Sequence, residues 1–250
     1  MKKPNKKPNV IKKNNKLIAL IVIPVLCVAL IMVAAAAITV ITSLQDFTAP
    51  VDRCDGDSPC MGPDKPIIYL YPTEPTEITV QTSHPENFTA EYPRYVNGWR
   101  VKAEPDGSLV DLNTGQELYA LYYESKNIVP ARVTSDGFVV KGLDTSQFLE
   151  EKLTVLGLNA RETEEFIIYW LPQMEKNQYN YIRFQTIDEI NQNMRLDITP
   201  RPDTLIRVLM AWRPLDAPIA VTEQRLEPAT RNGYTAVEWG GVIIGAELMR

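Results

Sequence analysis

Residues Lys65–Pro72 read KPIIYLYP, a short run of isoleucine, tyrosine and leucine that lies between two prolines. Ile67–Tyr71 has the composition of a buried strand, because β-branched and aromatic side chains are enriched in strands. Pro66 and Pro72 mark its two ends, since proline has no N–H to donate to a ladder. This stretch therefore predicts the first strand of the fold, and the other elements are placed outward from it.

The residues after this stretch predict a series of short strands. Pro105-Asp106-Gly107 and Asn113-Thr114-Gly115 have the composition of tight turns between neighbouring strands. The expected strands are Glu77–Thr82, Trp99–Ala103, Ser108–Asp111, Leu118–Tyr123, Gly137–Lys141, Tyr181–Gln185, Arg195–Ile198, Thr204–Trp212 and Thr235–Ile244.

In the middle of the chain the apolar residues change from a period of two to a helical period. Asp144–Gln147 predicts a capping box for a first helix, and Gly157 predicts where that helix stops. Asn159–Glu162 predicts a second capping box, opening a helix through about Met174 that Pro172 should kink or end. The expected fold class is α+β, a mostly antiparallel β-sheet with a helical hairpin, behind one N-terminal transmembrane helix.

The N-terminal segment predicts that helix. Residues 1–16 form a basic head with seven lysines and no acidic residue, and residues 17–42 are almost wholly apolar. As a helix this run would be roughly 39 Å long, enough for a hydrocarbon core of about 30 Å. The lysines before the run place the N-terminus in the cytoplasm. The alternative is a cleaved signal peptide, for which Ala34–Ala37 offers a cleavage site.

We therefore expect a single-pass protein of the cell membrane, with the lipid bilayer as a partner of residues 17–42. Residues 43–64 form a linker, and residues 65–250 form the extracytoplasmic domain. In an oxidising compartment Cys54 and Cys60 should pair in a disulfide that closes an acidic loop of the linker. Zinc, with His84 as a further ligand, and calcium in the acidic loop are the alternatives. We expect neither a metal nor a cofactor.

The charge of the chain bears on its partners. Without the seven lysines of the head, 19 of the 26 basic residues remain against all 31 acidic residues, a formal charge of −12. A chain this acidic lacks the basic surface with which nucleic-acid-binding proteins contact phosphates. An envelope glycan or a protein remains as the partner.

The opening stretch resembles the KPVIYLYP-like signature of an uncharacterised family of exported bacterial proteins with some fungal relatives. Later blocks match in order, from Tyr92-Pro93-Arg94-Tyr95 to the VEWGG block Val237–Gly241, so that the resemblance covers roughly residues 64–241. Leu121–Ser125 departs from it, because the family tends toward LFWEG there. The resemblance implies export and an α+β body, and it implies no known activity or catalytic residue.

Few residues suggest catalysis. His84 is the only histidine, and no serine lies in a G-x-S-x-G elbow, so only a carboxylate mechanism is a plausible hydrolase chemistry. Glu124 and Glu238 are the candidate catalytic pair. Paired carboxyls in glycosidases lie about 5–5.5 Å apart in retaining enzymes and about 6.5–9.5 Å apart in inverting ones. Asp203 and Arg207 indicate a separate, structural polar link.

Aromatic side chains suggest binding. The candidates for a sugar- or peptide-binding face are Trp99, Trp170, Trp212, Trp239, Tyr69, Tyr71, Tyr92 and Tyr95. Trp170 and Trp212 fall on apolar faces and are expected in the core. Trp99 and Trp239 lie near glycines and loops and are the candidate binding residues.

Three functions follow as hypotheses. The preferred one is a non-catalytic binding or interaction module that faces the cell envelope. The first alternative is a carboxylate-dependent hydrolase that acts on an extracellular or cell-wall glycan. The second is an accessory subunit of a membrane complex.

Overall fold

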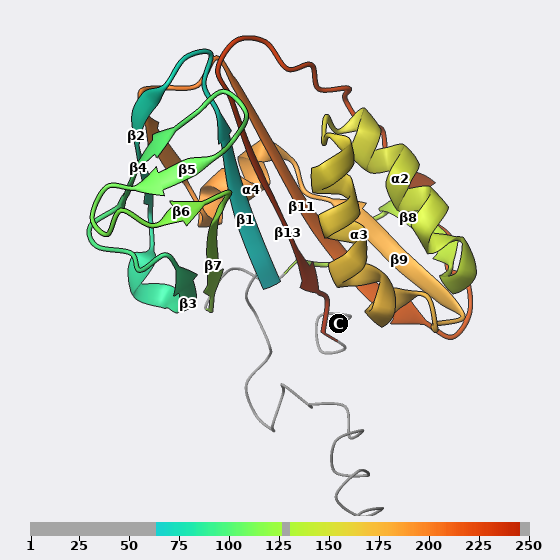
Figure 1. Ribbon diagram of the computed structural model, residues 1–250. Coiled ribbons are helices and arrows are strands. Elements are labelled where there is room, and N and C mark those ends of the chain that lie inside the picture. Colours follow the sequence, from blue (N-terminus) through green and yellow to red (C-terminus); the bar gives the residue numbers. More distant parts are fainter. Residues whose placement is uncertain (1–63, 127–130, 246–250) are drawn as a thin grey trace, which may run out of the picture. The chain divides into compact units, whose positions relative to one another are not determined.

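The computed structural model of the protein describes residues 64–126 and 131–245. In this part the chain is 41% strand and 22% helix, with two sheets and three α-helices (Figure 1). None of the helices described is long and apolar enough to cross a membrane. The basic head, the apolar run 17–42 and the two cysteines of the predicted disulfide lie outside the described residues.

The predicted fold class is therefore wrong. Within the described residues, the expected mostly antiparallel β-sheet with a helical hairpin is a mostly β structure of two sheets. The predicted transmembrane helix falls in residues 17–42, outside the described part, and stays a prediction. The physical reason lies in the pairing of the strands, which local sequence does not show. Leu118–Tyr123, predicted as one strand, is divided between the two sheets.

The large sheet has eight strands in the order β12-β8-β9-β11-β13-β1-β7-β3. In this order their bounds are Thr222–Glu223, Asp136–Lys141, Tyr179–Phe184, Thr204–Leu215, Thr235–Ile243, Asp64–Tyr71, Leu121–Ser125 and Phe88–Tyr92. The pairs β11–β13 and β12–β8 are parallel, and the other neighbouring pairs are antiparallel. The opening stretch thus forms β1, between β13 and β7.

The small sheet has five antiparallel strands in the order β10-β2-β4-β5-β6. Their bounds are Leu196–Thr199, Thr76–Thr82, Trp99–Ala103, Leu109–Asp111 and Glu117–Leu118. The two predicted turns join β4 to β5 and β5 to β6, and Gly107 and Gly115 adopt positive φ angles of 88° and 74° there. The predicted turn chemistry is confirmed.

Three α-helices complete the described part: α2 (Thr145–Val155), α3 (Ala160–Met174) and α4 (Ile187–Asn193). The predicted capping box of α3 is confirmed, because Glu162 N–H donates to Asn159 Oδ1 over 2.9 Å and the Glu162 carboxylate accepts from Asn159 N–H. The predicted box of α2 is wrong, since Asp144 makes no capping hydrogen bond. Pro172 lies inside α3 and does not end it.

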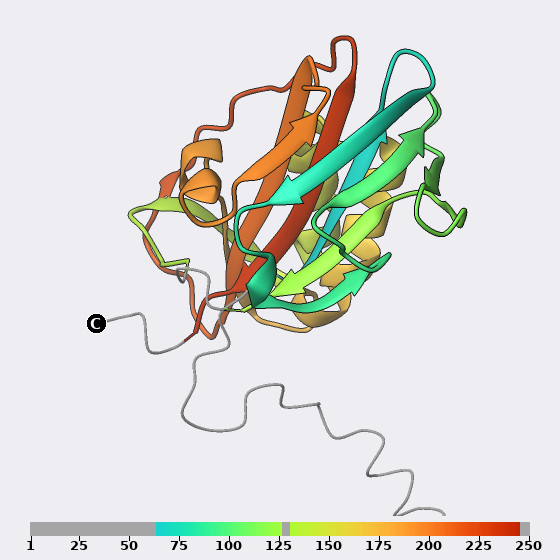
Figure 2. The same ribbon diagram turned by 90° about the vertical axis from the view of Figure 1, so that its left-hand side faces the viewer.

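The two faces of the large sheet build two cores. On β1, Ile67 and Tyr69 point to a core with α2 and α3, whereas Ile68 and Leu70 point to a core with the small sheet and α4. Figure 2 shows the small sheet and α4 in front of the large sheet, with α2 and α3 behind it. We call these the helix face and the small-sheet face.

Candidate functional site

The helix face continues past α3 toward β7 and β3, and there it carries tyrosines. Tyr122 on β7 lies opposite Ile67 on β1 and opposite Tyr92 on β3. Because residues directly opposite in a ladder share a face, Tyr122 and Tyr92 extend the face of Ile67. Tyr69 and Tyr71 point to the same side from β1, and Tyr119 lies beside Tyr69. We call these five residues the tyrosine face.

The five rings of the tyrosine face differ in their exposure to solvent. Tyr69 is buried against the helix, whereas Tyr71 and Tyr122 are half-buried. Tyr119 and Tyr92 are 48% and 50% exposed. The ring centroid of Tyr69 lies 6.4 Å from that of Tyr71, with parallel planes, and 6.4 Å from that of Tyr119. Tyr69, Tyr71 and Tyr119 thus form one group of neighbouring rings, and Tyr119 and Tyr92 are the accessible rings of the face.

The first turns of α3 hold the phenol groups in place. Tyr69 Oη donates to Glu165 Oε2 over 2.5 Å, and Tyr71 Oη donates to Glu162 Oε1 over 2.7 Å. Glu162 is fully buried and also forms an ion pair with Arg231. Glu162 thus serves two purposes at once, because the residue that caps α3 also fixes a tyrosine of the sheet.

Burial and the neighbouring carboxylates raise the pKa of both phenols. For Tyr69 the main cause is removal from water, followed by the hydrogen bond to Glu165. For Tyr71 it is again removal from water, followed by the charge of Glu162. Both groups therefore stay protonated at neutral pH and act as hydrogen-bond donors. A raised pKa disfavours the phenolate that nucleophilic catalysis by tyrosine would need.

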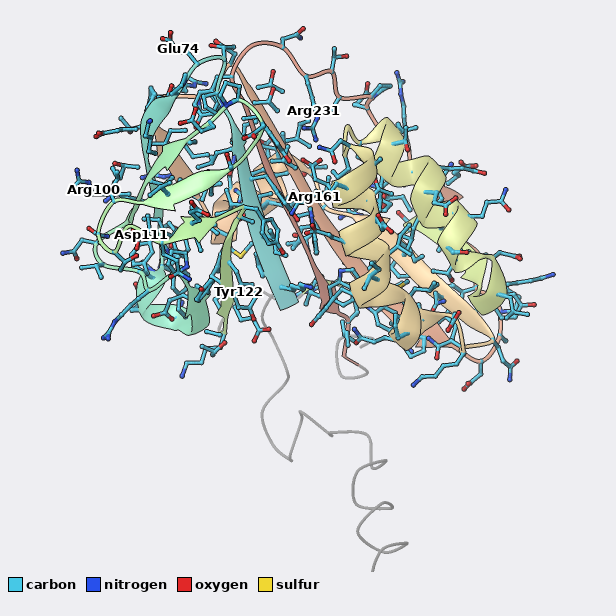
Figure 3. The ribbon with its side chains drawn as sticks, in the orientation of Figure 1. Glu74, Arg100, Asp111, Tyr122, Arg161 and Arg231 are labelled. Carbon is cyan, nitrogen blue, oxygen red and sulfur yellow. The ribbon has the colours of Figure 1, made fainter. Side chains whose placement is uncertain are left out.

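Two arginines border the tyrosine face. The Arg161 guanidinium lies 4.4 Å from the ring centroid of Tyr119, and that of Arg231 lies 5.3 Å from the ring centroid of Tyr71. Arg161 Nε also donates to Glu165 Oε1 over 2.9 Å. Figure 3 shows Arg231, Arg161 and Tyr122 one below the other between the small sheet and α3. Since each arginine is paired with a glutamate, the border offers hydrogen-bonding groups with little net charge.

A turn of the small sheet closes one end of this face. A Cβ atom on Gly107 would lie 2.5 Å from the ring of Tyr71, and Gly107 has a φ of +88°. Only glycine suits this conformation and this distance. The β4–β5 turn thus packs directly on Tyr71, and Gln116 from the β5–β6 turn donates to the phenol oxygen of Tyr92.

The structure places the predicted catalytic pair on opposite faces of the large sheet. Glu238 lies opposite Ile68, which points to the small-sheet face. Glu124 is two residues from Tyr122, so it points to the helix face at its edge. The backbone of the sheet therefore lies between the two carboxylates. Glu124 borders the tyrosine face, whereas Glu238 is buried.

Glu238 belongs to a buried polar cluster between the two sheets. It accepts from Arg207 Nε over 2.6 Å and from Tyr123 Oη over 2.8 Å. Arg207 also donates to Asn191 Oδ1 and to the carbonyl of Met194. Burial, and then the charge of Glu238, raises the pKa of Tyr123. Arg207 Nε and Nη1 thus donate to protein groups and Nη2 lies 2.5 Å from Glu238 Oε2, so the cluster is structural.

The predicted polar link around Arg207 is present with a different partner. Arg207 pairs with Glu238, and Asp203 instead accepts a hydrogen bond from Tyr234 N–H over 2.8 Å.

The two candidate binding tryptophans are both buried. Trp99 is 1% exposed and its indole donates to the carbonyl of Pro93 over 2.7 Å. Trp239 is fully buried beside Phe166. The glycines after Trp239 lie inside β13, where a Cβ on Gly241 would come within 2.5 Å of the Trp170 ring. They mark a close packing contact rather than a loop. Trp170 and Trp212 lie in the core as predicted.

Tyr119, Tyr122, Arg161 and Arg231 were not predicted as site residues from the sequence. The alternation at Leu121–Tyr123 could have placed Tyr122 on an outer face. No local signal connects Arg231 with Glu162, which is 69 residues away along the chain.

Metal ligands are not grouped in the part of the chain that the structure describes, where no three His, Cys, Asp or Glu residues surround a possible ion. His84 is exposed and pairs with Glu86 over 3.0 Å.

No protein-family model, no curated protein sequence and no solved structure matches this chain.

Proposed function

We propose that this protein is a non-catalytic binding module whose tyrosine face holds a glycan chain of the cell envelope. The observation that carries the proposal is the position of Tyr71, Tyr92, Tyr119 and Tyr122 beside the buried Tyr69, where the helix face is only partly covered. In this proposal the apolar run 17–42 anchors the domain to the outer side of the cell membrane.

The chemistry of a sugar suits this surface. A pyranose ring has an apolar face of C–H groups, which stacks on an aromatic ring, and an edge of hydroxyls, which needs hydrogen-bonding partners. Tyr92 and Tyr119 offer the accessible rings. Arg161 and Glu124 lie at the border of the same face and can bond hydroxyls. The pairing of Arg161 with Glu165 favours a neutral glycan over a strongly charged one.

Two observations favour binding over hydrolysis. The only carboxylate pair that the sequence suggested, Glu124 and Glu238, is divided by the sheet. Glu162, the carboxylate nearest to Tyr71, has no exposed surface, and its oxygens already bond Tyr71, Asn159 and Arg231. Neither arrangement offers an acid and a base to one glycosidic bond.

The test is retention of the full chain, in detergent micelles, on insoluble cell-wall glycan, followed by titration with neutral oligosaccharides released from it. Tyr119→Ala and Tyr92→Ala should each weaken binding about tenfold, which corresponds to about 1.4 kcal/mol. Ile168→Ala is the matched control, because Ile168 is 64% exposed on α3 and lies outside the tyrosine face. The proposal fails if the chain is not retained, or if all three variants bind like the unchanged protein.

A further inference from the structure

The opposite edge of the large sheet is only partly covered. The edge strand β12 pairs with Asp136 and Gly137 of β8 and with no later residue of that strand. Phe138–Lys141 pair with β9 on their inner side. Half of β8 thus forms a sheet edge within the described part of the chain.

The direction of the backbone groups on this half of β8 follows from its neighbours. Gly142 N–H donates to Gln178 O, so the residues of even number bond toward β9. Val139 and Lys141 therefore direct their backbone groups away from β9, because adjacent residues of a strand alternate. The Lys141 carbonyl accepts from Thr145 Oγ1 over 3.2 Å. The N–H and C=O of Val139 and the N–H of Lys141 have no partner in the described part.

A groove of about 440 Å³ lies along this edge. Its floor is Gly137–Val140, and one wall is formed by Phe148, Glu151 and Lys152 of α2. Ile219–Val221 and Glu223 form the opposite wall. The Lys152 ammonium lies 5.3 Å from the ring centroid of Phe138 and 3.9 Å from the Glu223 carboxylate. The lining of the groove combines apolar side chains, such as Phe138, Phe148 and Ile219, with the charged side chains of Glu151, Lys152 and Glu223.

The ladder between β12 and β8 ends at Glu223. The side chain of Gln224 accepts from Phe184 N–H over 3.0 Å and donates to Phe184 O over 2.6 Å. Gln224 N–H still donates to the carbonyl of Gly137 over 3.2 Å, and no later residue of this segment pairs with β8 in the described part. The position beside Val139 and Lys141, which a longer β12 would occupy, is left to the groove.

We propose that this groove binds an extended peptide segment of a partner protein, which adds to the large sheet as a further strand beside β8. The exposed backbone groups of Val139 and Lys141 supply main-chain hydrogen bonds. Another extended backbone can pair with these groups, because its own N–H and C=O groups have the same spacing. Alternate side chains of the peptide enter the groove between α2 and Ile219–Val221, where they meet the apolar side chains of Phe148 and Ile219. This site is separate from the tyrosine face, at the other edge of the same sheet, and does not depend on the proposed glycan function.

The test begins with the full chain in detergent micelles and a displayed library of random linear heptapeptides. We expect enriched peptides with an apolar residue at every second position. A synthetic copy of the strongest peptide is then titrated against the Val139→Pro and Val139→Ala variants. Proline removes the outward N–H and leaves the β9 ladder intact, so it should weaken binding at least tenfold. Alanine keeps the N–H and should stay within about threefold of the unchanged protein.

Peptides with single N-methyl groups give a second measurement that needs no variant of the protein. N-methylation at alternate positions should abolish binding, and methylation at the positions between should be tolerated, because a strand bonds its neighbour through every second residue. Failure to enrich any peptide, or insensitivity to N-methylation, would overturn the proposal. Self-association of the chain that Val139→Pro abolishes, without peptide binding, would assign the edge to a second copy and would also overturn it.

Discussion

Glu238 and Glu162 each form an ion pair with an arginine and accept a hydrogen bond from a tyrosine, yet the two clusters lie in different surroundings. Glu238 pairs with Arg207 and Tyr123 between the two sheets, where the side chains of the ion pair are 5% and 1% exposed. Glu162 pairs with Arg231 and Tyr71 at the start of α3, where the Arg231 side chain is 27% exposed. The same three residue types thus occur once wholly inside the protein and once where the arginine is partly exposed to solvent.

The difference lies in what remains after one partner is removed. A charge left alone between the sheets cannot reach water, so the loss of its partner costs far more than the ion pair contributes. Arg231 is partly hydrated already and can turn to solvent. The inner cluster (Glu238, Arg207 and Tyr123) is therefore required for a stable fold. The outer cluster (Glu162, Arg231 and Tyr71) instead positions the tyrosine face.

The largest effect is expected from Arg207→Met. The substitution leaves the Glu238 carboxylate without a counter-charge in the core, and we expect a loss of about 3–5 kcal/mol in the free energy of unfolding. Urea denaturation measures it. The double variant Arg207→Met/Glu238→Leu is the control, because it removes both charges and should lose less than the single variant. A single-variant loss below about 1 kcal/mol would show that the inner pair is not structural.

The second effect concerns Glu162→Ala. This change removes one half of the α3 capping box and the partner of Tyr71 and Arg231, which predicts a loss of about 2 kcal/mol. It should also weaken glycan binding, since Tyr71 is no longer held. Glu165→Ala, which loses the bond to Tyr69 but no cap, is the matched control and should cost less stability. A loss from Glu162→Ala equal to that from Arg207→Met would remove the distinction between the clusters.

The elements of the fold could largely be predicted, because their signals are local. Ile67–Tyr71 lies within β1, and Asn159–Glu162 opens α3 as its capping box indicates. The strand partners could not be predicted in the same way. The parallel pairing of β11 with β13 joins residues about 30 positions apart, and no turn residue records it. The short α4 was missed although Thr186 and Glu189 form a capping box there.

The candidate site was predicted only in part, and for a similar reason. Tyr69, Tyr71 and Tyr92 were among the predicted binding residues because amphipathic aromatic rings suit a binding face. The spacing of Tyr69 and Tyr71 by two on one strand places them on the same face. Arg231 comes to Tyr71 only through the tertiary fold. Trp239 was misjudged because glycine has two uses, in loops and where a large ring packs on a strand, and the sequence does not distinguish them.

The third effect appears at high pH. In the folded protein the pKa values of Tyr71 and Tyr123 lie above the ordinary value of 10.0, so both keep their protons at a pH where the unfolded chain releases them. Their contribution to stability is therefore complete below pH 10 and is lost as the pH rises above it. Above pH 10, each of the two tyrosines should lower the free energy of unfolding by about 1.4 kcal/mol per pH unit.

Urea denaturation between pH 9 and pH 11 measures this slope. Tyr123→Phe and Tyr71→Phe should each flatten it, because phenylalanine has no proton to release. Ile168→Ala is the control, since Ile168 is 64% exposed on α3 and has no ionisable group. If Tyr71→Phe flattens the slope and Tyr123→Phe does not, the inner cluster is less enclosed than its contacts indicate.

The smallest effect is expected from Arg161→Ala. The ion pair of Arg161 with Glu165 is a helix pair at the surface, with the arginine side chain 58% exposed, and such pairs contribute about 0.5 kcal/mol or less. Its stacking on Tyr119 is similarly accessible to water and adds little to stability. The unfolding free energy should therefore hardly change, while affinity for the oligosaccharide falls. Arg161→Lys keeps the charge but loses the planar stacking group, so it should bind like Arg161→Ala if stacking is what the ligand uses. A loss of stability as large as that of Glu162→Ala would instead show that Arg161 stabilises the fold. Arg161 would then belong to the outer cluster, together with Glu162, Arg231 and Tyr71.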